Sequence, residues 1–179
     1  SPRSRPHQSR KIPKAEADDI IAVLVKKISQ NNNTKCKIVI LADDYDYCQL
    51  LKYPYVSAYN FSGKKFQELI PSIDNEDPKK IQNFLRNKIL KGDRSDGIPR
   101  CKRLDSIDDN SINLDDFSIK EKFNLLNLGI LRVRYICNEE IEILQENPSL
   151  IMVWMERDPI FRKDWIRNSY LIDMSYIPK

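Results

Sequence analysis

The chain lacks the residues that zinc sites and histidine-based hydrolytic sites require. Its 179 residues include one histidine, His7, and four cysteines that form no CxxC pair. A zinc site needs clustered cysteine or histidine ligands, and general base catalysis by histidine needs that residue in the folded part of the chain. The sequence therefore predicts neither kind of site. We expect the four cysteines to be free thiols in a reducing compartment.

Long apolar runs are also missing. No stretch approaches the roughly 18 consecutive apolar residues of a membrane-spanning helix, and no secretory signal pattern is present. Glycine is scarce, at four residues, while 41% of the chain is apolar, so most of it should fold around a sizeable core. We expect a soluble protein of the cytoplasm with no membrane partner.

Acidic residues are absent from the first 14 positions, which carry five arginines and lysines. The whole chain has a formal charge of +4, but the remainder has 25 basic and 26 acidic residues, a net charge of −1. The basic character therefore lies in a leading arm, residues 1–14, which we expect to be disordered. Two interpretations remain open: contact with nucleic acid phosphates, or a tail without a role in binding.

Acidic residues gather where a predicted strand ends. The apolar run 38–41 predicts a short buried strand of a parallel sheet, and Asp43, Asp44 and Asp46 follow it. Open α/β sheets usually place their ligand sites at the carboxyl ends of strands. If the chain stays extended, alternation puts Asp44 and Asp46 on the same side.

A second acidic cluster precedes that strand. Residues 15–29 have apolar side chains at helical spacing, and Glu16 and Asp18 lie in the first turn of the predicted helix. Acids at this position complement the helix dipole, which is the simplest explanation for one of them. Three acids within residues 16–19 are more than capping requires.

The third acidic cluster follows another predicted helix. Residues 78–91 should form this helix, with Asp77 as its cap and Gly92 as its end. Asp93 and Asp96 come directly afterwards, three positions apart, and would face the same way on a turn.

The rest of the chain predicts shorter elements. We expect a hairpin of strands 56–59 and 65–69, an irregular linker over 100–117, and helices over 118–127, 139–145 and 158–171. The predicted organisation is the arm 1–14, a partial α/β core 15–76 and a helical region 77–179.

Carboxylates from three separate segments suit a site for divalent cations. Mg²⁺ and Mn²⁺ prefer oxygen ligands, and two such ions about 4 Å apart hydrolyse phosphodiesters without a histidine base. The candidate ligands and catalytic residues are Glu16, Asp18, Asp44, Asp46, Asp93 and Asp96. The alternative is that these acids are solvated side chains at the ends of elements.

Three ordered motifs resemble the 5′-nuclease superfamily, which includes the flap endonucleases. The motifs are IPKAEADDIIAVLVKK, ADDYDYCQLLKYPYV and ILKGDRSDGIP, and the final RNSYLIDMSYIP resembles a late segment of the family. Within the superfamily they resemble the ribonuclease H branch of T-even-type bacteriophages. The resemblance runs from about Lys11 to the end and is strongest over 15–99.

The resemblance implies an α/β fold: part of a PIN-like, mostly parallel 5′-nuclease sheet, followed by a helical region of the helix–three-turn–helix type. It implies a metal-dependent 5′→3′ exonuclease or flap endonuclease that acts on RNA–DNA duplexes and 5′ flaps and removes primers during replication in a phage-infected cell. Two Mg²⁺ or Mn²⁺ ions are expected. Glu16, Asp18 and Asp44 would serve the first ion. Asp46, Asp93 and Asp96 would serve the second, partly through water.

The resemblance also implies partners. The helix–three-turn–helix element of the family holds duplex phosphates, and the residues expected to do so here are Lys88, Lys91, Arg94, Arg100, Lys102 and Arg103. The alternative is that they are solvated surface charges. Besides DNA or RNA–DNA duplexes with a 5′ end or flap, the expected partners are a single-stranded-DNA-binding protein or a sliding clamp.

Two departures from the family bear on activity. The family's first strand, with its aspartate, and the arch-forming segment do not lie in this chain, so the expected site is incomplete. Tyr45 stands where a glycine is usual, and Asp43 replaces a small residue. Three interpretations remain open: a split nuclease completed by a second chain that carries the N-terminal half, a truncated product, or an inactive DNA-binding module or structural subunit.

Overall fold

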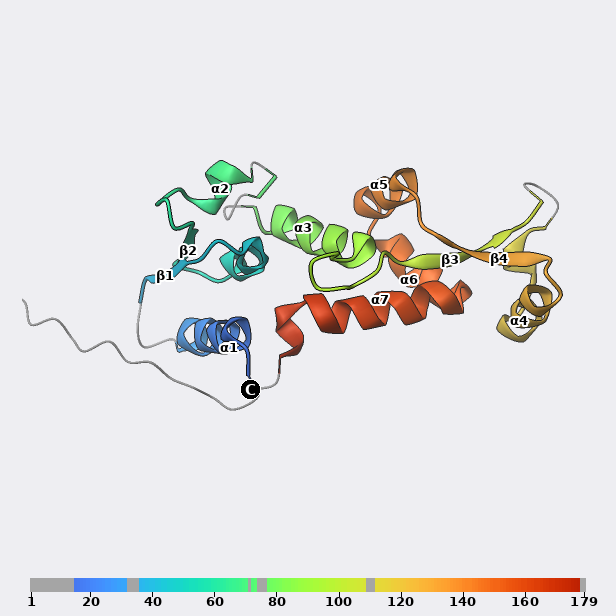
Figure 1. Ribbon diagram of the computed structural model, residues 1–179, viewed down its shortest axis with the longest axis horizontal. Coiled ribbons are helices and arrows are strands. Elements are labelled where there is room, and N and C mark those ends of the chain that lie inside the picture. Colours follow the sequence, from blue (N-terminus) through green and yellow to red (C-terminus); the bar gives the residue numbers. More distant parts are fainter. Residues whose placement is uncertain (1–14, 32–35, 71, 74–76, 109–111, 178–179) are drawn as a thin grey trace, which may run out of the picture.

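The computed structural model describes residues 15–31, 36–70, 72–73, 77–108 and 112–177 (Figure 1). The predicted basic arm lies outside the described residues. The described chain is elongated, with an α/β part at one end, a β-hairpin at the other, and two long helices between them.

The α/β part begins with helix α1 and contains a parallel pair of strands. Its elements are α1 (Ala17–Gln30), β1 (Ile38–Leu41), the 3₁₀ helix η1 (Tyr45–Lys52), β2 (Val56–Tyr59) and α2 (Phe66–Leu69). β1 and β2 pair in parallel from Ile38 opposite Val56 to Leu41 opposite Tyr59. The α/β class with a parallel sheet, predicted from the apolar run of β1, is therefore confirmed.

The predicted hairpin of strands 56–59 and 65–69 is wrong. Val56–Tyr59 is a strand, but it pairs with β1, and only Lys65 forms an isolated bridge back to Tyr59. The chain then becomes helical, and α2 carries the fully buried Phe66 into the core. Whether a segment forms a strand depends on the partners available in the folded chain. Here Val56–Tyr59 pairs with β1, and residues 65–69 do not form the second strand of a hairpin.

One hydrophobic core holds the α/β part together. It combines the inner face of α1 with β1, β2, η1 and α2, and includes Ala22, Val25, Ile40, Cys48, Leu50, Val56, Ala58, Phe66 and Ile81. Ile81 belongs to α3 (Pro78–Lys91), so this core also fixes the start of α3. The bounds of α3 agree with the prediction: the Asp77 side chain accepts a hydrogen bond from Lys79 N at 3.0 Å, and Gly92 caps the other end.

The predicted irregular linker over 100–117 is wrong. It contains β3 (Lys102–Ser106), which pairs antiparallel with β4 (Leu131–Tyr135). The backbone N–H groups of Lys102 and Leu104 donate to the carboxylates of Asp164 and Asp158, at 3.0 and 2.8 Å. These partners lie about sixty residues away in sequence, so local composition could not indicate the strand.

Helices make up most of the remaining chain, as predicted. They are α4 (Ile119–Asn127), α5 (Asn138–Glu146), α6 (Ser149–Arg157) and α7 (Pro159–Ile172), with short 3₁₀ turns η2 (Leu114–Asp116) and η3 (Met174–Tyr176). The predictions for α4, α5 and α7 are confirmed to within one or two residues, and α6 was not predicted. All four cysteines are free, as expected.

Helix α7 joins the two ends of the molecule. It lies along α3 (Figure 1), and its C-terminal end reaches the α/β part, where Gln49 of η1 donates to the backbone oxygen of Ile172 at 3.0 Å. The Gln49 side chain also accepts a hydrogen bond from Met174 N at 2.9 Å. Gln49 is only 1% exposed, so its buried amide both donates and accepts within the protein. Because α3 packs on both η1 and α7, the end of α3 is held at a fixed place beside η1. In the described part of the chain, no helix is long and apolar enough to cross a membrane.

Candidate functional site

A cleft between η1 and the end of α3 collects acidic side chains from two of the three predicted clusters. We call it the acid cleft; its volume is about 440 Å³. Its lining residues are Asp43, Asp44, Tyr45, Asp46, Lys88, Asp93, Ser95 and Asp96. The packing of α3 on η1 therefore brings together four of the six predicted ligands from positions about fifty residues apart.

The turn over residues 92–99 is closed by backbone hydrogen bonds. Asp93 N donates to Ile98 O at 2.8 Å, and Ile98 N donates to Asp93 O at 2.7 Å. Gly92 starts the turn with a φ of +72°, and a Cβ there would meet the backbone oxygens of Ile98 and Pro99. Only glycine fits such a close approach in the left-handed region. The turn thus holds its side chains in fixed directions.

Asp44 and Asp46 reach the cleft in a different way from that predicted. The chain does not stay extended after β1; Asp44 caps η1, and its carboxylate accepts a hydrogen bond from Asp46 N at 2.8 Å. Asp46 then lies in the first turn of η1. A short polar side chain that caps a helix offers the backbone an alternative to the extended conformation. Both carboxylates still line the acid cleft.

Three carboxylates lie close enough to share a cation. One oxygen each from Asp46, Asp93 and Asp96 lies within 4.8 Å of the others, and within the described ranges this is the one group of three or more potential ligands with such spacing. All donors are hard oxygen atoms, which suits Mg²⁺ or Mn²⁺ and not a softer metal. These three are also the residues expected to serve the second ion.

Lys88 supplies a positive charge inside this group. Its Nζ forms ion pairs with Asp46 Oδ1 and with Asp93 Oδ2, the latter at 3.1 Å. Asp93 also accepts hydrogen bonds from the hydroxyl and the backbone N–H of Ser95. The hydrogen bond from the Ser95 hydroxyl is the largest cause that lowers the pKa of Asp93, to about 2, and Lys88 lowers it further. Burial acts in the opposite direction. Asp93 is therefore ionised at neutral pH. The sequence analysis missed this role of Lys88, because it depends on how α3 docks on η1.

The acids of α1 do not line the acid cleft. Glu16 is the exposed N-cap of α1, and its backbone N–H donates to Asp19 Oδ2 at 3.2 Å. The Asp18 carboxylate accepts from Asp19 N at 3.0 Å. Burial and then the charges of Asp18 and Asp44 raise the pKa of Tyr47, so both acids lie near one buried tyrosine. The assignment of Glu16 and Asp18 to a metal stays a prediction.

The two unusual neighbours of the aspartates have partners of their own. The Tyr45 ring packs edge-on against Phe66, with centroids 5.2 Å apart, and Asp43 Oδ1 accepts from Phe61 N at 3.0 Å. Both residues line the cleft. Asp43 thus adds a carboxylate that the sequence analysis did not count among the ligands.

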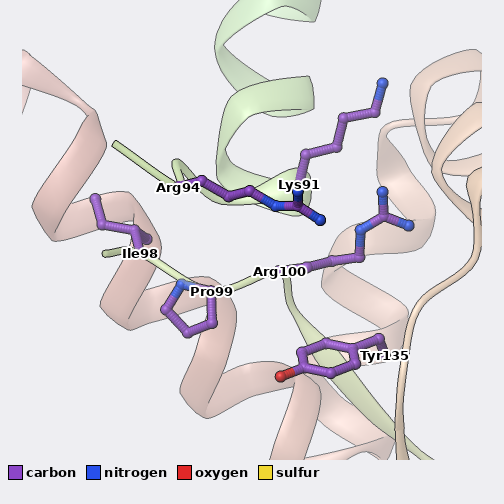
Figure 2. A pocket seen from close by; sticks show the side chains of 6 residues that line it. All are labelled: Lys91, Arg94, Ile98, Pro99, Arg100 and Tyr135. Carbon is purple, nitrogen blue, oxygen red and sulfur yellow. The ribbon is translucent and has the colours of Figure 1, made fainter. Parts of the chain in front are cut away.

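Three of the six predicted nucleic-acid contacts line a second hollow, also of about 440 Å³, which we call the basic hollow. Its lining residues are Lys91, Arg94, Ile98, Pro99, Arg100 and Tyr135 (Figure 2). In this view the Arg94 and Arg100 guanidinium groups extend into the same space, with the Lys91 ammonium nearby and the Tyr135 ring below.

The other three predicted contacts are engaged elsewhere or lie at the margin. Lys88 belongs to the acid cleft. Arg103 pairs with Glu140 at 2.6 Å and stacks over Trp154, 4.4 Å from the ring centroid. Lys102 lies over the ring of Tyr135, at 5.0 Å from its centroid, and so borders the basic hollow.

Comparison with known proteins finds sequence similarity to a bacteriophage ribonuclease. No family model matches the chain. Ribonuclease H of Enterobacteria phage T4 is 40% identical over 91 residues, which cover 51% of this chain and 27% of the phage protein. The chain is thus similar in sequence to part of a phage ribonuclease. This confirms the resemblance that the three motifs indicated.

The relationship covers only part of the known proteins. The matched stretch spans about a quarter of the length of the T4 ribonuclease H. Among solved structures, the T5 D15 protein co-crystallised with metal ions is 18% identical with a TM-score of 0.49, and the alignment covers 94% of this chain and 54% of D15.

Proposed function

We propose that this chain carries a metal-binding and nucleic-acid-binding part of a 5′-nuclease, an enzyme that hydrolyses phosphodiester bonds. The observation that carries the proposal is the turn 92–99. It presents Asp93 and Asp96 to the acid cleft and Arg94, Ile98 and Pro99 to the basic hollow. A phosphate held by the basic side would lie next to carboxylates that suit a divalent cation.

The residues proposed to hold Mg²⁺ or Mn²⁺ are Asp46, Asp93 and Asp96, with Asp44 beside them and Glu16 and Asp18 from α1. Such a cation, when bound, lowers the pKa of its water ligand and neutralises charge on the phosphate. The chain's own groups prepare for it. Ser95 keeps Asp93 ionised, and in the absence of a cation the Lys88 ammonium offsets the repulsion between the carboxylates of Asp46 and Asp93.

The finer assignment follows the family likeness. We propose 5′→3′ exonuclease or flap endonuclease activity of the RNase H type on RNA–DNA or flapped DNA during replication, in the cytoplasm of a phage-infected cell. A second chain with the N-terminal nuclease half is proposed to complete the site. The further partners proposed are a single-stranded-DNA-binding protein or a sliding clamp.

A second candidate is a nucleic-acid-binding module without hydrolysis. Two observations favour it: Lys88 occupies the carboxylates that would bind a cation, and no acid lines the basic hollow among the residues the structure describes. Such a module would hold nucleic acid equally well with and without a divalent cation.

Hydrolysis of a 5′-labelled flap and of an RNA–DNA duplex separates the two candidates. The purified chain is assayed with Mg²⁺, with Mn²⁺ and with EDTA, alongside Asp46→Asn and the matched control Asp116→Asn, an exposed acid outside the cleft. Metal-dependent cleavage that Asp46→Asn abolishes and Asp116→Asn retains supports the nuclease. Binding of the same substrates in EDTA without any cleavage, and without Mn²⁺ binding that depends on Asp46, supports the binding module.

A further inference from the structure

An exposed aromatic ring borders the three cations of the basic hollow. Tyr135 ends β4, and the strand register sets it opposite Lys102 of β3. Its side chain is 54% exposed, although the next residue, Ile136, is 1% exposed in the core. Lys102 Nζ lies 5.0 Å from the ring centroid. The hairpin therefore brings an aromatic ring, from a segment that the sequence motifs do not include, to the turn 92–99.

The described part of the chain does not neutralise the positive charges of the hollow, and it holds one of them, Arg100, in place. Arg100 Nη1 donates to the backbone oxygen of Ile136 at 3.1 Å, which fixes the guanidinium and leaves its other N–H groups available. Within the described residues, the side chains of Lys91 and Arg94 have no ion-pair or hydrogen-bond partner. Several donors around one space favour an anion with several acceptor oxygens, such as a phosphodiester.

An aromatic ring beside phosphate-binding cations is the arrangement that binds unpaired nucleotides. Every base offers a π-face, and stacking on an aromatic side chain contributes about 1–3 kcal/mol per base. A base inside a duplex already stacks on its neighbours and cannot offer that face. The ring of Tyr135 would add little to the binding of a blunt duplex, whose contacts with basic residues are mainly to phosphates.

We propose that the basic hollow binds one unpaired nucleotide of a nucleic acid strand. The phosphate lies among Lys91, Arg94 and Arg100, and the base stacks on Tyr135. The ligand class is therefore a nucleic acid with a single-stranded segment that places an unpaired base on Tyr135. The inference rests on the proposed function only in so far as the chain must bind nucleic acid.

Fluorescence anisotropy in EDTA tests the proposal without any hydrolysis. The probes are a labelled single-stranded oligodeoxynucleotide and a blunt duplex of the same sequence, and the variants are Tyr135→Ala and the matched control Tyr135→Phe. Alanine should weaken binding of the single strand roughly 5- to 150-fold, whereas phenylalanine, which keeps the ring, should bind as the wild type does. The loss on the duplex should be smaller. Circular dichroism checks that each variant is folded.

A single strand with abasic positions sharpens the result. If Tyr135 stacks on a base, removing the bases should weaken wild-type binding and leave Tyr135→Ala almost unaffected, because the same interaction is lost in both cases. Equal single-strand affinities of the alanine and phenylalanine variants, or absence of single-strand binding by the wild type, would overturn the proposal.

Failure of this inference is distinguishable from failure of the nuclease proposal. Metal-dependent cleavage combined with single-strand binding that does not depend on Tyr135 would reject the stacking site alone. Ring-dependent single-strand binding in EDTA, combined with no Mn²⁺ binding that depends on Asp46, would reject the metal-dependent nuclease proposal alone.

Discussion

The two sides of the turn 92–99 differ in how their charges are balanced. On the acid side, Asp93 is paired with Lys88 and Ser95, and Asp44 with the Asp46 backbone. On the basic side, Lys91 and Arg94 have no such partner within the described chain. The acid cleft is thus organised by the protein itself, whereas the proposed partner of the basic hollow is an external anion.

This difference fits the roles proposed for the two sides of the turn, a cation site in the acid cleft and a phosphate site in the basic hollow. Carboxylates that must hold one cation repel each other when it is absent, and an internal ammonium group offsets that repulsion. In the proposed function, the phosphates of the nucleic acid would balance the charges of Lys91 and Arg94. One rigid turn between the two sides couples their positions.

The largest expected effect comes from breaking both sides at once with Gly92→Ala. The new Cβ would meet the backbone of Ile98 and Pro99 at a φ of +72°, so we expect a loss of roughly 2–4 kcal/mol in the free energy of unfolding. Urea denaturation measures it. The matched control is Gly97→Ala, which has a φ of +69° but no atom within 4 Å of the added Cβ. It should lose only about 1 kcal/mol. Equal losses would show that the close approach at Gly92 is unimportant.

Arg94→Ala should weaken nucleic acid binding at the basic hollow and leave the acid cleft unchanged. Removing one phosphate contact reduces the slope of log affinity against log salt by about 1, and we expect nucleic acid affinity to fall roughly tenfold at moderate salt. Anisotropy at several salt concentrations measures the slope. Arg132→Ala, whose side chain pairs with Asp105 away from the hollow, serves as the control. An unchanged slope in Arg94→Ala would place the phosphate elsewhere.

Lys88→Met should change cation binding in the acid cleft alone, and it should strengthen that binding. Because the ammonium group competes with a divalent cation for Asp46 and Asp93, its removal should tighten Mn²⁺ binding severalfold, by about 1 kcal/mol or less for such a partly exposed pair. Calorimetric titration with Mn²⁺ measures the change. Weaker Mn²⁺ binding in a folded Lys88→Met variant would mean that Lys88 supports the metal site and does not compete for it.

The smallest effect is a pH dependence of stability. The pKa of Asp93 is about 2 in the folded chain, below the ordinary value of 3.8, so its ionised form stabilises the fold. That contribution is fully present above about pH 4 and is lost as the pH falls toward 2. Urea denaturation of wild type and Asp93→Asn across this range should show two curves that converge at low pH. A difference that stays constant with pH would contradict the depressed pKa.

The sequence predicted what local signals determine. The bounds of α3 follow from Asp77, Pro78 and Gly92, which act within one turn of the helix ends. The parallel strand β1 and the acidic turn at 93–96 were likewise indicated by short patterns. In contrast, β3 has few apolar residues. Asp158, the N-cap of α7, and Asp164 on α7 help to position it, so only the tertiary structure reveals it.

In the candidate site too, some features follow from the local sequence and others depend on tertiary packing. Four acidic residues of the cleft, Asp44, Asp46, Asp93 and Asp96, were predicted from residue type and order, whereas Asp43 was not. The ion pairs of Lys88 were not, because they depend on the docking of α3 against η1. Tyr135 was missed for a similar reason, since the β3–β4 pairing alone brings it to the turn.

The most direct test of the central claim is a Mn²⁺ titration of the purified chain and of three variants, Asp46→Asn, Asp96→Asn and Asp116→Asn. The account predicts that wild type and Asp116→Asn bind Mn²⁺ alike. The two cleft variants should lose roughly 10- to 100-fold in affinity, as expected when a metal site is disrupted. Equal Mn²⁺ affinities in all four proteins, or no binding by the wild type, would contradict the assignment of the acid cleft as a metal site.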